Sequence, residues 1–239
     1  REGAAAVALS ATKRAKRPVV CVPCGMWYTY IDNPHDELVE LMDELEREIF
    51  WRPRPDLPLS QRIYRFADVS LTIKEIEFLG EPSQGPLPER IAALTDHILK
   101  GIEKEYDITP ETDKVPERVK ELRSRVIQAL EEENLDSTTR AKLHDQLDDL
   151  FLAVQLYSYP GDYVSEEPTI ERVAETLDKF EEDLLNRFSA TVRGSRQAKV
   201  AFGEPIPIER SKNRRKATAA LTEQMEQGVQ DLIDQLRGA

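Results

Sequence analysis

The sequence predicts a predominantly helical protein, in which an α/β remnant of about two strands with flanking helices is interrupted by a large all-α insertion. The 239 residues are 40% hydrophobic, 33% charged and only 7% aromatic, which is typical of a soluble, helix-rich globular chain. Only two segments, one near each end, have the character of strands. The long region between them has helical periodicity throughout, and its longest apolar runs are too short to span a membrane.

The two predicted strands occupy residues 17–28 and 197–208. The first (RPVVCVPCGMWY) is a mostly β-branched and aromatic run that begins after Pro18, and the second (QAKVAFGEPIPI) places apolar side chains at every second position. We expect the two segments to lie side by side in one sheet. The region between them is then an excursion from that sheet.

Helices are predicted wherever apolar residues recur at three-to-four spacing along one face. Asn33 and Pro34 provide a cap and a first-turn proline for the first of them, the prolines of residues 51–58 end it, and Gly80 ends the second. The Pro-Gly pair predicts a loop at residues 157–163 (YSYPGDY). We find no internal repeat. The predicted helices span residues 38–49, 59–80, 86–98, 119–130, 143–154, 170–188 and 217–236.

Charge divides the chain at the same places as the strands do. Residues 31–190 hold 38 acidic and 19 basic residues, whereas residues 1–30 and 191–239 together hold 14 basic and 7 acidic residues. We therefore expect residues 1–30 and 191–239 to form one domain, and residues 31–190 to form an acidic helical insertion.

Two basic clusters adjoin the predicted strands, and a shared sheet would bring them to one edge. Such an edge would attract phosphate head groups or an anionic membrane surface, although each cluster alone is also compatible with a solvated rim. Nucleic acid is disfavoured, because the insertion is acidic and no aromatic residue lies among the basic ones. The clusters consist of Lys13, Arg14, Lys16 and Arg17, and of Arg210, Lys212, Arg214, Arg215 and Lys216.

Cys21 and Cys24 are the only cysteines, so a disulfide scaffold is not expected. Their Cys-x-x-Cys spacing is also that of thiol oxidoreductases, in which a helix begins at once after the motif. Here the pair lies within a strand, where residues three apart point to opposite faces. We expect structural cysteines, and a redox pair stays as an alternative.

No complete active site can be assembled from the three histidines. His144 and Asp149 have the spacing that marks the catalytic base in one acyltransferase superfamily, but residues five apart on a helix do not share a face, and Asp148 would be the nearer neighbour. His35 and His97 have no second ligand or base at metal-like or triad-like spacing. We predict no catalytic residue and no metal site in this chain.

Both ends of the chain resemble the phospholipid/glycerol acyltransferases of the lysophosphatidate acyltransferase type. Gly3-Ala4-Ala5 resembles the helix after the family's Glu-Gly-Thr-Arg motif, residues 19–28 with Val22-Pro23 resemble its Val-Pro strand, and residues 200–206 (VAFGEPI) resemble its late strand. Within the insertion, a bacterial subgroup with a long helical region has similar runs at residues 51–54 (WRPR), 57–59 (LPL), 74–80 (KEIEFLG) and 159–163 (YPGDY).

The resemblance implies transfer of an acyl group from acyl-CoA or acyl carrier protein to a glycerophosphate hydroxyl, with a His base held by an Asp and no metal or redox cofactor. In the family, that His and Asp lie upstream of the Gly-Ala-Ala helix. We therefore expect this chain to be an inactive C-terminal part of such an enzyme. Val22 and Pro23 are then substrate-positioning residues, and Cys24 and Trp27 packing residues.

The same resemblance implies a cytoplasmic protein at the inner face of the membrane, with an acyl donor and a glycerophospholipid as its partners. The acidic insertion is expected to be a lid or docking module over the acyltransferase core. Two readings from other classes stay open, namely a helical scaffold or interaction module without catalysis, and a thiol oxidoreductase that uses Cys21 and Cys24.

Overall fold

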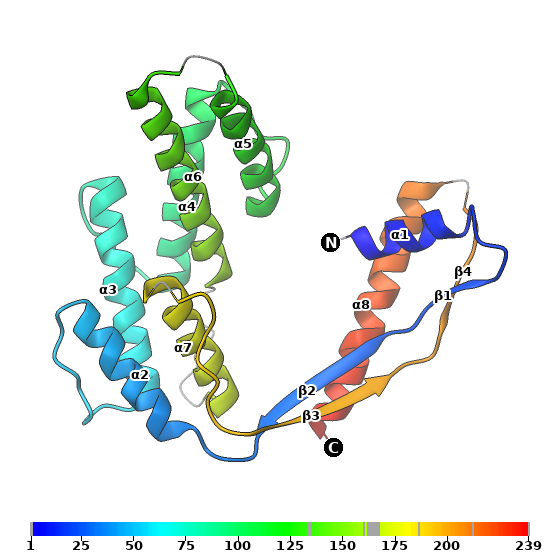
Figure 1. Ribbon diagram of the computed structural model, residues 1–239, viewed down its shortest axis with the longest axis horizontal. Helices are drawn as coiled ribbons and strands as arrows, with labels where there is room; N and C mark the ends of the chain where they lie inside the picture. The colour runs from blue at the N-terminus through cyan, green and yellow to red at the C-terminus, as the bar shows by residue number, and fades with distance from the viewer. Residues whose placement is uncertain are drawn as a thin grey trace. The chain divides into compact units, whose positions relative to one another are not determined.

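A computed structural model describes residues 2–132, 135–159, 161, 168–185, 187–211 and 213–238. This part of the chain holds eight helices and four short strands, so the predominantly helical fold class is confirmed (Figure 1). Two compact units are present: Arg1–Pro34 with Val192–Ala239 forms the strand unit, and His35–Thr191 forms the helical unit. The charge pattern put the boundaries at residues 30 and 190, and the contacts put them at 34 and 191.

The two predicted strands pair in antiparallel register, but each is broken into two. β1 (Val19–Cys21) pairs with β4 (Ile206–Ile208), and β2 (Cys24–Tyr30) pairs with β3 (Arg196–Phe202). The breaks face each other, because Pro23 has no N–H to donate to a ladder and Pro205 lies in the opposite interruption. The Gly203 N–H donates to the Pro23 carbonyl at 2.9 Å, so the two ladders continue as one ribbon.

Two helices, α1 (Gly3–Ala11) and α8 (Arg214–Gly238), complete the strand unit. Ala5, Ala8 and Leu9 of α1 pack with Ile206 of β4 and Leu221 of α8 in a small apolar core. Figure 1 shows α8 running along the ribbon.

Contact between α8 and β2 is close enough to require glycine in the strand. A Cβ atom on Gly25 would lie 2.7 Å from the Leu232 Cβ. A larger residue at position 25 would therefore force the helix away from the ribbon.

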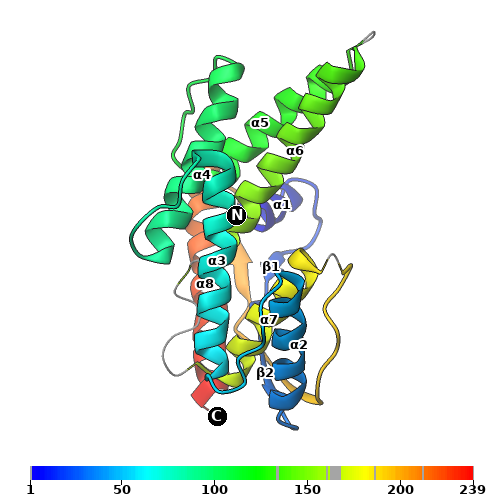
Figure 2. The same cartoon turned by 90° about the vertical axis from the view of Figure 1, so that its left-hand side faces the viewer.

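The helical unit consists of α2 (His35–Glu48), α3 (Leu59–Leu79), α4 (Leu87–Glu105), α5 (Val115–Leu130), α6 (Ser137–Ser158) and α7 (Ile170–Leu184). Figure 2 shows α4, α5 and α6 together at one end of the unit, where they share an apolar core with α3. At the other end, α2 packs against α7, and the Phe66 and Phe180 rings lie 5.3 Å apart between α3 and α7.

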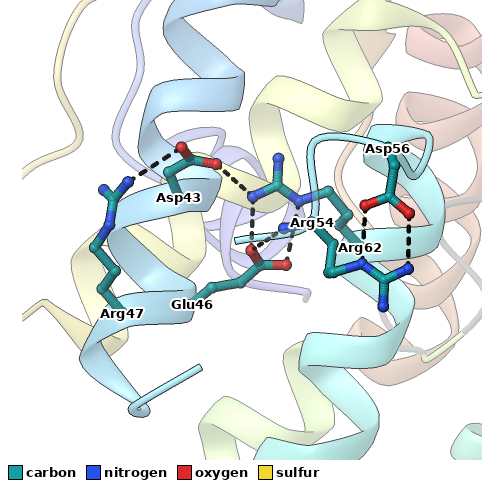
Figure 3. Close-up of polar contacts among 6 residues, drawn as sticks. All are labelled: Asp43, Glu46, Arg47, Arg54, Asp56 and Arg62. Atoms are coloured by element: carbon teal, nitrogen blue, oxygen red, sulfur yellow. Dashed lines mark hydrogen bonds and ion pairs between the residues drawn. The ribbon is translucent and has the colours of Figure 1, made fainter. Parts of the chain in front are cut away.

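Buried arginines of this unit bind carboxylates of the preceding helix across the helix turns. We call each such arginine with its carboxylate partners a staple. Arg62 of α3 is 2% exposed, and its Nε and Nη2 atoms donate to both oxygens of Glu46 of α2 at 3.1 and 2.7 Å. Arg62 Nη2 also donates to Asp43 at 2.6 Å (Figure 3). The Arg54 N–H of the α2–α3 loop donates to the same Glu46 at 3.2 Å, so the staple also holds the loop.

The same staple recurs between α3 and α4 and between α4 and α5. Arg90 forms a fork with Glu75 at 2.9 and 2.7 Å and donates to Asp68 as well. Arg118 forms a fork with Glu103 at 2.7 and 2.9 Å and donates to Asp96 at 2.9 Å. The hydrogen bonds from Arg90 lower the pKa of Glu75. Burial raises the pKa of Asp96, but hydrogen bonds from Lys100 and Arg118 outweigh it, so that pKa is also lowered.

These staples correct the prediction that the chain has no internal repeat. Arg62, Arg90 and Arg118 lie 28 residues apart, and each is the fourth residue of its helix, after Leu59, Leu87 and Val115 respectively. The carboxylate partner lies near the end of the preceding helix in every case. The repeat is a helix turn with one polar cluster. Its sequence also recurs in part, since residues 87–91 (LPERI) and 115–119 (VPERV) are closely similar and residues 59–63 (LSQRI) share the apolar residues and the arginine.

Most predicted helices are confirmed, and the corrections concern their ends. α7 stops at Leu184, so Phe188 lies beyond the helix with its side chain fully exposed. α6 extends to Ser158, so Tyr157 and Ser158 belong to a helix and not to the predicted loop. Pro160 and residues 162–163 of that loop lie outside the described residues, as does Lys212.

We expect Arg90→Met to lower the free energy of unfolding by about 3–5 kcal/mol, because it leaves the fully buried Glu75 carboxylate without its cation. Replacing both partners, with Glu75→Leu and Arg90→Met together, should cost less than the single change, since no buried charge then lacks a partner. Urea unfolding followed by helix content measures both.

Lys142→Met is the matched control, because its ion pair with Glu105 is exposed and should contribute little to stability. If Arg90→Met proves as mild as this control, the staple does not hold the helices as described.

Candidate functional site

Val22 and Pro23, the expected substrate-positioning residues, lie at the break between β1 and β2. The Val22 side chain is 47% exposed, whereas Pro23 is buried against α8. A Cβ atom on Gly228 of α8 would lie 2.9 Å from the Pro23 Cγ, so the helix passes the strand break at a glycine. Val22 and Pro23 are neighbours at the strand break, but the Val22 side chain is exposed to solvent and the Pro23 ring is covered by α8.

A cavity of about 620 Å³ opens beside Pro23 between the ribbon and α8. Among the described residues, no cation lines this cavity. Its polar lining consists of carboxylates and amides, those of Glu204, Glu223, Gln224, Gln227, Asp231 and Gln235. The Gln227 amide donates to Asp231 at 2.7 Å. This lining would repel a phosphate group, so the cavity does not suit the phosphate end of a glycerophosphate.

The two basic clusters meet at one end of the strand unit. Arg210 Nε donates to the Thr12 carbonyl at 3.0 Å, and the guanidinium of Arg214 donates to Ser10 Oγ. Because α1 and α8 also pack together, the segment after α1 and the segment before α8 lie side by side. The sequence predicted a shared edge conditionally, and the contacts of Arg210 and Arg214 bring the second cluster to the end of α1, where the first cluster begins.

Cys21 and Cys24 are both free, and they belong to different faces of the ribbon. Cys21 packs against the apolar core formed by α1, β4 and α8, whereas Cys24 is exposed on the face that also carries Met26 and Tyr28. This placement fits two structural cysteines better than a redox pair.

We expect a maleimide reagent to modify Cys24 quickly and Cys21 slowly, because the Cys24 thiol is exposed and Cys21 is partly buried. Mass spectrometry at short reaction times measures the two rates, and Cys24→Ser should leave one slowly reacting thiol. A chain with no reactive thiol before reduction and two afterwards would restore the thiol oxidoreductase reading.

The structure does not bring His144 and Asp149 together as a catalytic pair. Both are on α6, where His144 is exposed and Asp149 is half-buried beside a groove. Burial, together with the nearby Glu77, Asp145 and Asp148, raises the pKa of Asp149. His35 and His97 are exposed as well.

That groove, of about 940 Å³, lies within the helical unit among α3, α4, α6 and α7, and sequence reasoning missed it. Its floor is apolar, with Leu71, Phe78, Leu152 and Phe180 among its lining residues. No motif marks it, because its walls come from four separate amphipathic faces. The faces could have been recognised from their periodicity, but not the gap between them.

Tyr159 and Lys179 form a polar corner of the groove. The Tyr159 hydroxyl donates to Asp183 at 2.7 Å, and Lys179 Nζ lies 4.1 Å from the centre of the Tyr159 ring. Burial, followed by the neighbouring Asp183, raises the pKa of Tyr159, and burial lowers the pKa of Lys179. Tyr159 is therefore a packing and hydrogen-bonding group at neutral pH.

We expect Asp149→Asn to stabilise the protein at neutral pH, because the raised pKa of Asp149 means that its charged form destabilises the folded state. The advantage should shrink as the pH falls through the folded-state pKa and vanish below the ordinary value of 3.8, where the carboxyl is protonated in both states. Thermal unfolding as a function of pH measures it. Glu121→Gln, at an exposed position of α5, is the control and should change little. A stabilisation that persists at low pH would contradict this account.

Among the described residues, no three His, Cys, Asp or Glu side chains are placed to hold a metal ion. No helix there combines the length and the apolar character needed to cross a bilayer.

Comparison of the chain with models of known protein families, with curated proteins and with solved structures finds no match. A functional reading therefore rests on the residues and their arrangement.

Proposed function

We propose that this chain is the C-terminal part of a glycerolipid acyltransferase, which transfers an acyl group from a thioester donor to a hydroxyl of a (lyso)glycerophosphate. One observation carries the proposal. The segments that resemble the family's Val-Pro strand and late strand are separated by the whole helical unit, yet they pair in register, with Met26 opposite Val200. The helices with the matching positions in the family, α1 and α8, pack on the same ribbon.

The open face of the ribbon supports the same reading. Val20, Val22, Met26 and Tyr28 alternate along the first strand segment and are each about half exposed, and Phe202 on the partner strand is 72% exposed. A strand that is apolar on both faces is typical of an α/β sheet with layers on both sides, and α8 supplies only one layer here. The ribbon therefore has the character of part of a larger sheet.

The helical unit supports the proposal because its core contacts lie within the unit itself. Its core and staples are formed within His35–Thr191, as an insertion into another domain requires. Its role as a lid or docking module over the acyltransferase core belongs to the proposal.

In the proposed enzyme the base and its orienting carboxylate come from the family's upstream motif, and this chain supplies part of the sheet. Val22 and Pro23 act as positioning residues near the substrate. The base takes the proton from the acceptor hydroxyl while the hydroxyl oxygen attacks the thioester carbonyl. The bond from carbonyl carbon to sulfur then breaks, and the thiol leaves with that proton. Acyl-CoA and acyl carrier protein both remain candidate donors, and the reaction takes place in the cytoplasm, at the inner face of the membrane.

The test compares this chain with a longer protein that joins it to the polypeptide encoded directly upstream in the same reading frame. Thiol release from acyl-CoA and from acyl carrier protein is measured with lysophosphatidate as acceptor. We expect turnover from the longer protein only, and we expect His144→Ala to leave that turnover unchanged because His144 is an exposed residue of α6.

Turnover by the chain alone that disappears with His144→Ala would overturn the proposed division of roles. An upstream sequence that lacks a His followed, after four intervening residues, by an Asp, together with no thiol release, would favour the non-catalytic helical scaffold instead.

A further inference from the structure

The cationic end of the strand unit is formed by two segments that tertiary structure joins, residues 13–17 and 210–216. Arg210 and Arg214 fix them to each other through Thr12 and Ser10. Among the described cations of this end, all are exposed: Lys13, Arg14, Lys16, Arg17, Arg210, Arg214, Arg215 and Lys216.

Almost no negative charge offsets this end. Within residues 12–17 and 209–216 the single acidic residue is Glu209, and the next carboxylate along α8 is that of Glu223. Glu223 follows Lys216 by seven residues, which is about 10 Å along a helix axis. That distance is about one Debye length at moderate salt, so the carboxylates of α8 screen the cations weakly.

The arrangement suits an extended anionic surface better than a small anion. None of these cations lines either of the two cavities described above, and all of them lie after α1 or around the start of α8. A small phosphate site would need side chains that converge around one point. Cations spread over two segments instead act together on a surface that carries many charges.

An apolar helix face beside the cations distinguishes a membrane from a nucleic acid. α1 consists of small and apolar residues, and Ala4, Val7 and Ala11 are exposed on it, with Val7 71% exposed. Arg214 is hydrogen-bonded to this helix, so the apolar face and the cations are neighbours. An interfacial lipid layer accommodates apolar side chains next to cations, whereas a phosphate backbone gains nothing from them.

We propose that this end of the strand unit docks on the surface of a bilayer that contains anionic phospholipids. Each Lys or Arg near such a surface strengthens binding about fivefold, so the cations act as a set and no single one is essential. The proposal stands on these charges and this helix face, and it does not depend on the acyl transfer proposed above.

The experiment measures co-sedimentation of the whole chain with vesicles of phosphatidylcholine alone and of phosphatidylcholine mixed with phosphatidylglycerol. Binding is expected only to the anionic vesicles and should weaken as salt is raised. Lys13→Gln with Arg14→Gln should weaken it by about 25-fold, and Arg215→Gln with Lys216→Gln by a similar factor. The four changes together should reduce it by the product of the two factors.

Lys120→Gln with Arg123→Gln is the matched control, since it removes the same charge from exposed positions of α5 in the helical unit. The control should bind vesicles as the unchanged chain does, and circular dichroism should show equal helix content in every variant. Equal losses in the control and the test pairs would overturn the proposal, as would equal binding to neutral vesicles.

Two competitors test the other occupants. Inorganic phosphate that displaces the chain from vesicles better than chloride at equal ionic strength would indicate a discrete phosphate site, and tighter binding to duplex DNA than to anionic vesicles would indicate a nucleic-acid surface. Either result would overturn membrane docking. Because no acyl donor is present, none of these outcomes bears on the proposed acyl transfer.

Discussion

A buried guanidinium that is held by two carboxylates at a helix turn is the interaction on which the helical unit depends. Arg62, Arg90 and Arg118 each lie in the first turn of a helix, and their glutamate partners lie near the end of the helix before it. The macrodipole disfavours a cation at the start of a helix and an anion at its end, so each charge is unfavourable within its own helix. Pairing across the turn removes both penalties.

That arrangement also specifies how the helices connect. A bidentate fork allows little freedom in distance or angle, so each staple fixes the turn as well as the helix pair. Backbone N–H groups of the loops add to it, with Arg54 donating to Glu46 and Ser83 donating to Glu75. The apolar faces pack between the helices that the staples connect.

The strand unit depends on close backbone approach instead of buried charge. Gly25 admits Leu232 of α8 against β2, and Gly228 admits Pro23 against α8. These two contacts hold the helix along the ribbon while the opposite face of the ribbon stays open. The same packing of α1 and α8 gathers the cations at one end of the unit, so one arrangement leaves both an apolar face and a charged end available to partners.

The sequence by itself determined the number and order of the helices in the acidic region, the two extended segments near the ends, and the separation of charge along the chain, because periodicity and composition are local properties. Only the tertiary structure decided that Arg90 and Glu75 are buried partners, that Asp149 lies at a groove while His144 faces solvent, and that Arg210 and Arg214 meet α1. A charged residue has the same local pattern on a solvated face and in a buried pair. Its environment is set by residues distant in the chain, and those come into place only when the helices pack.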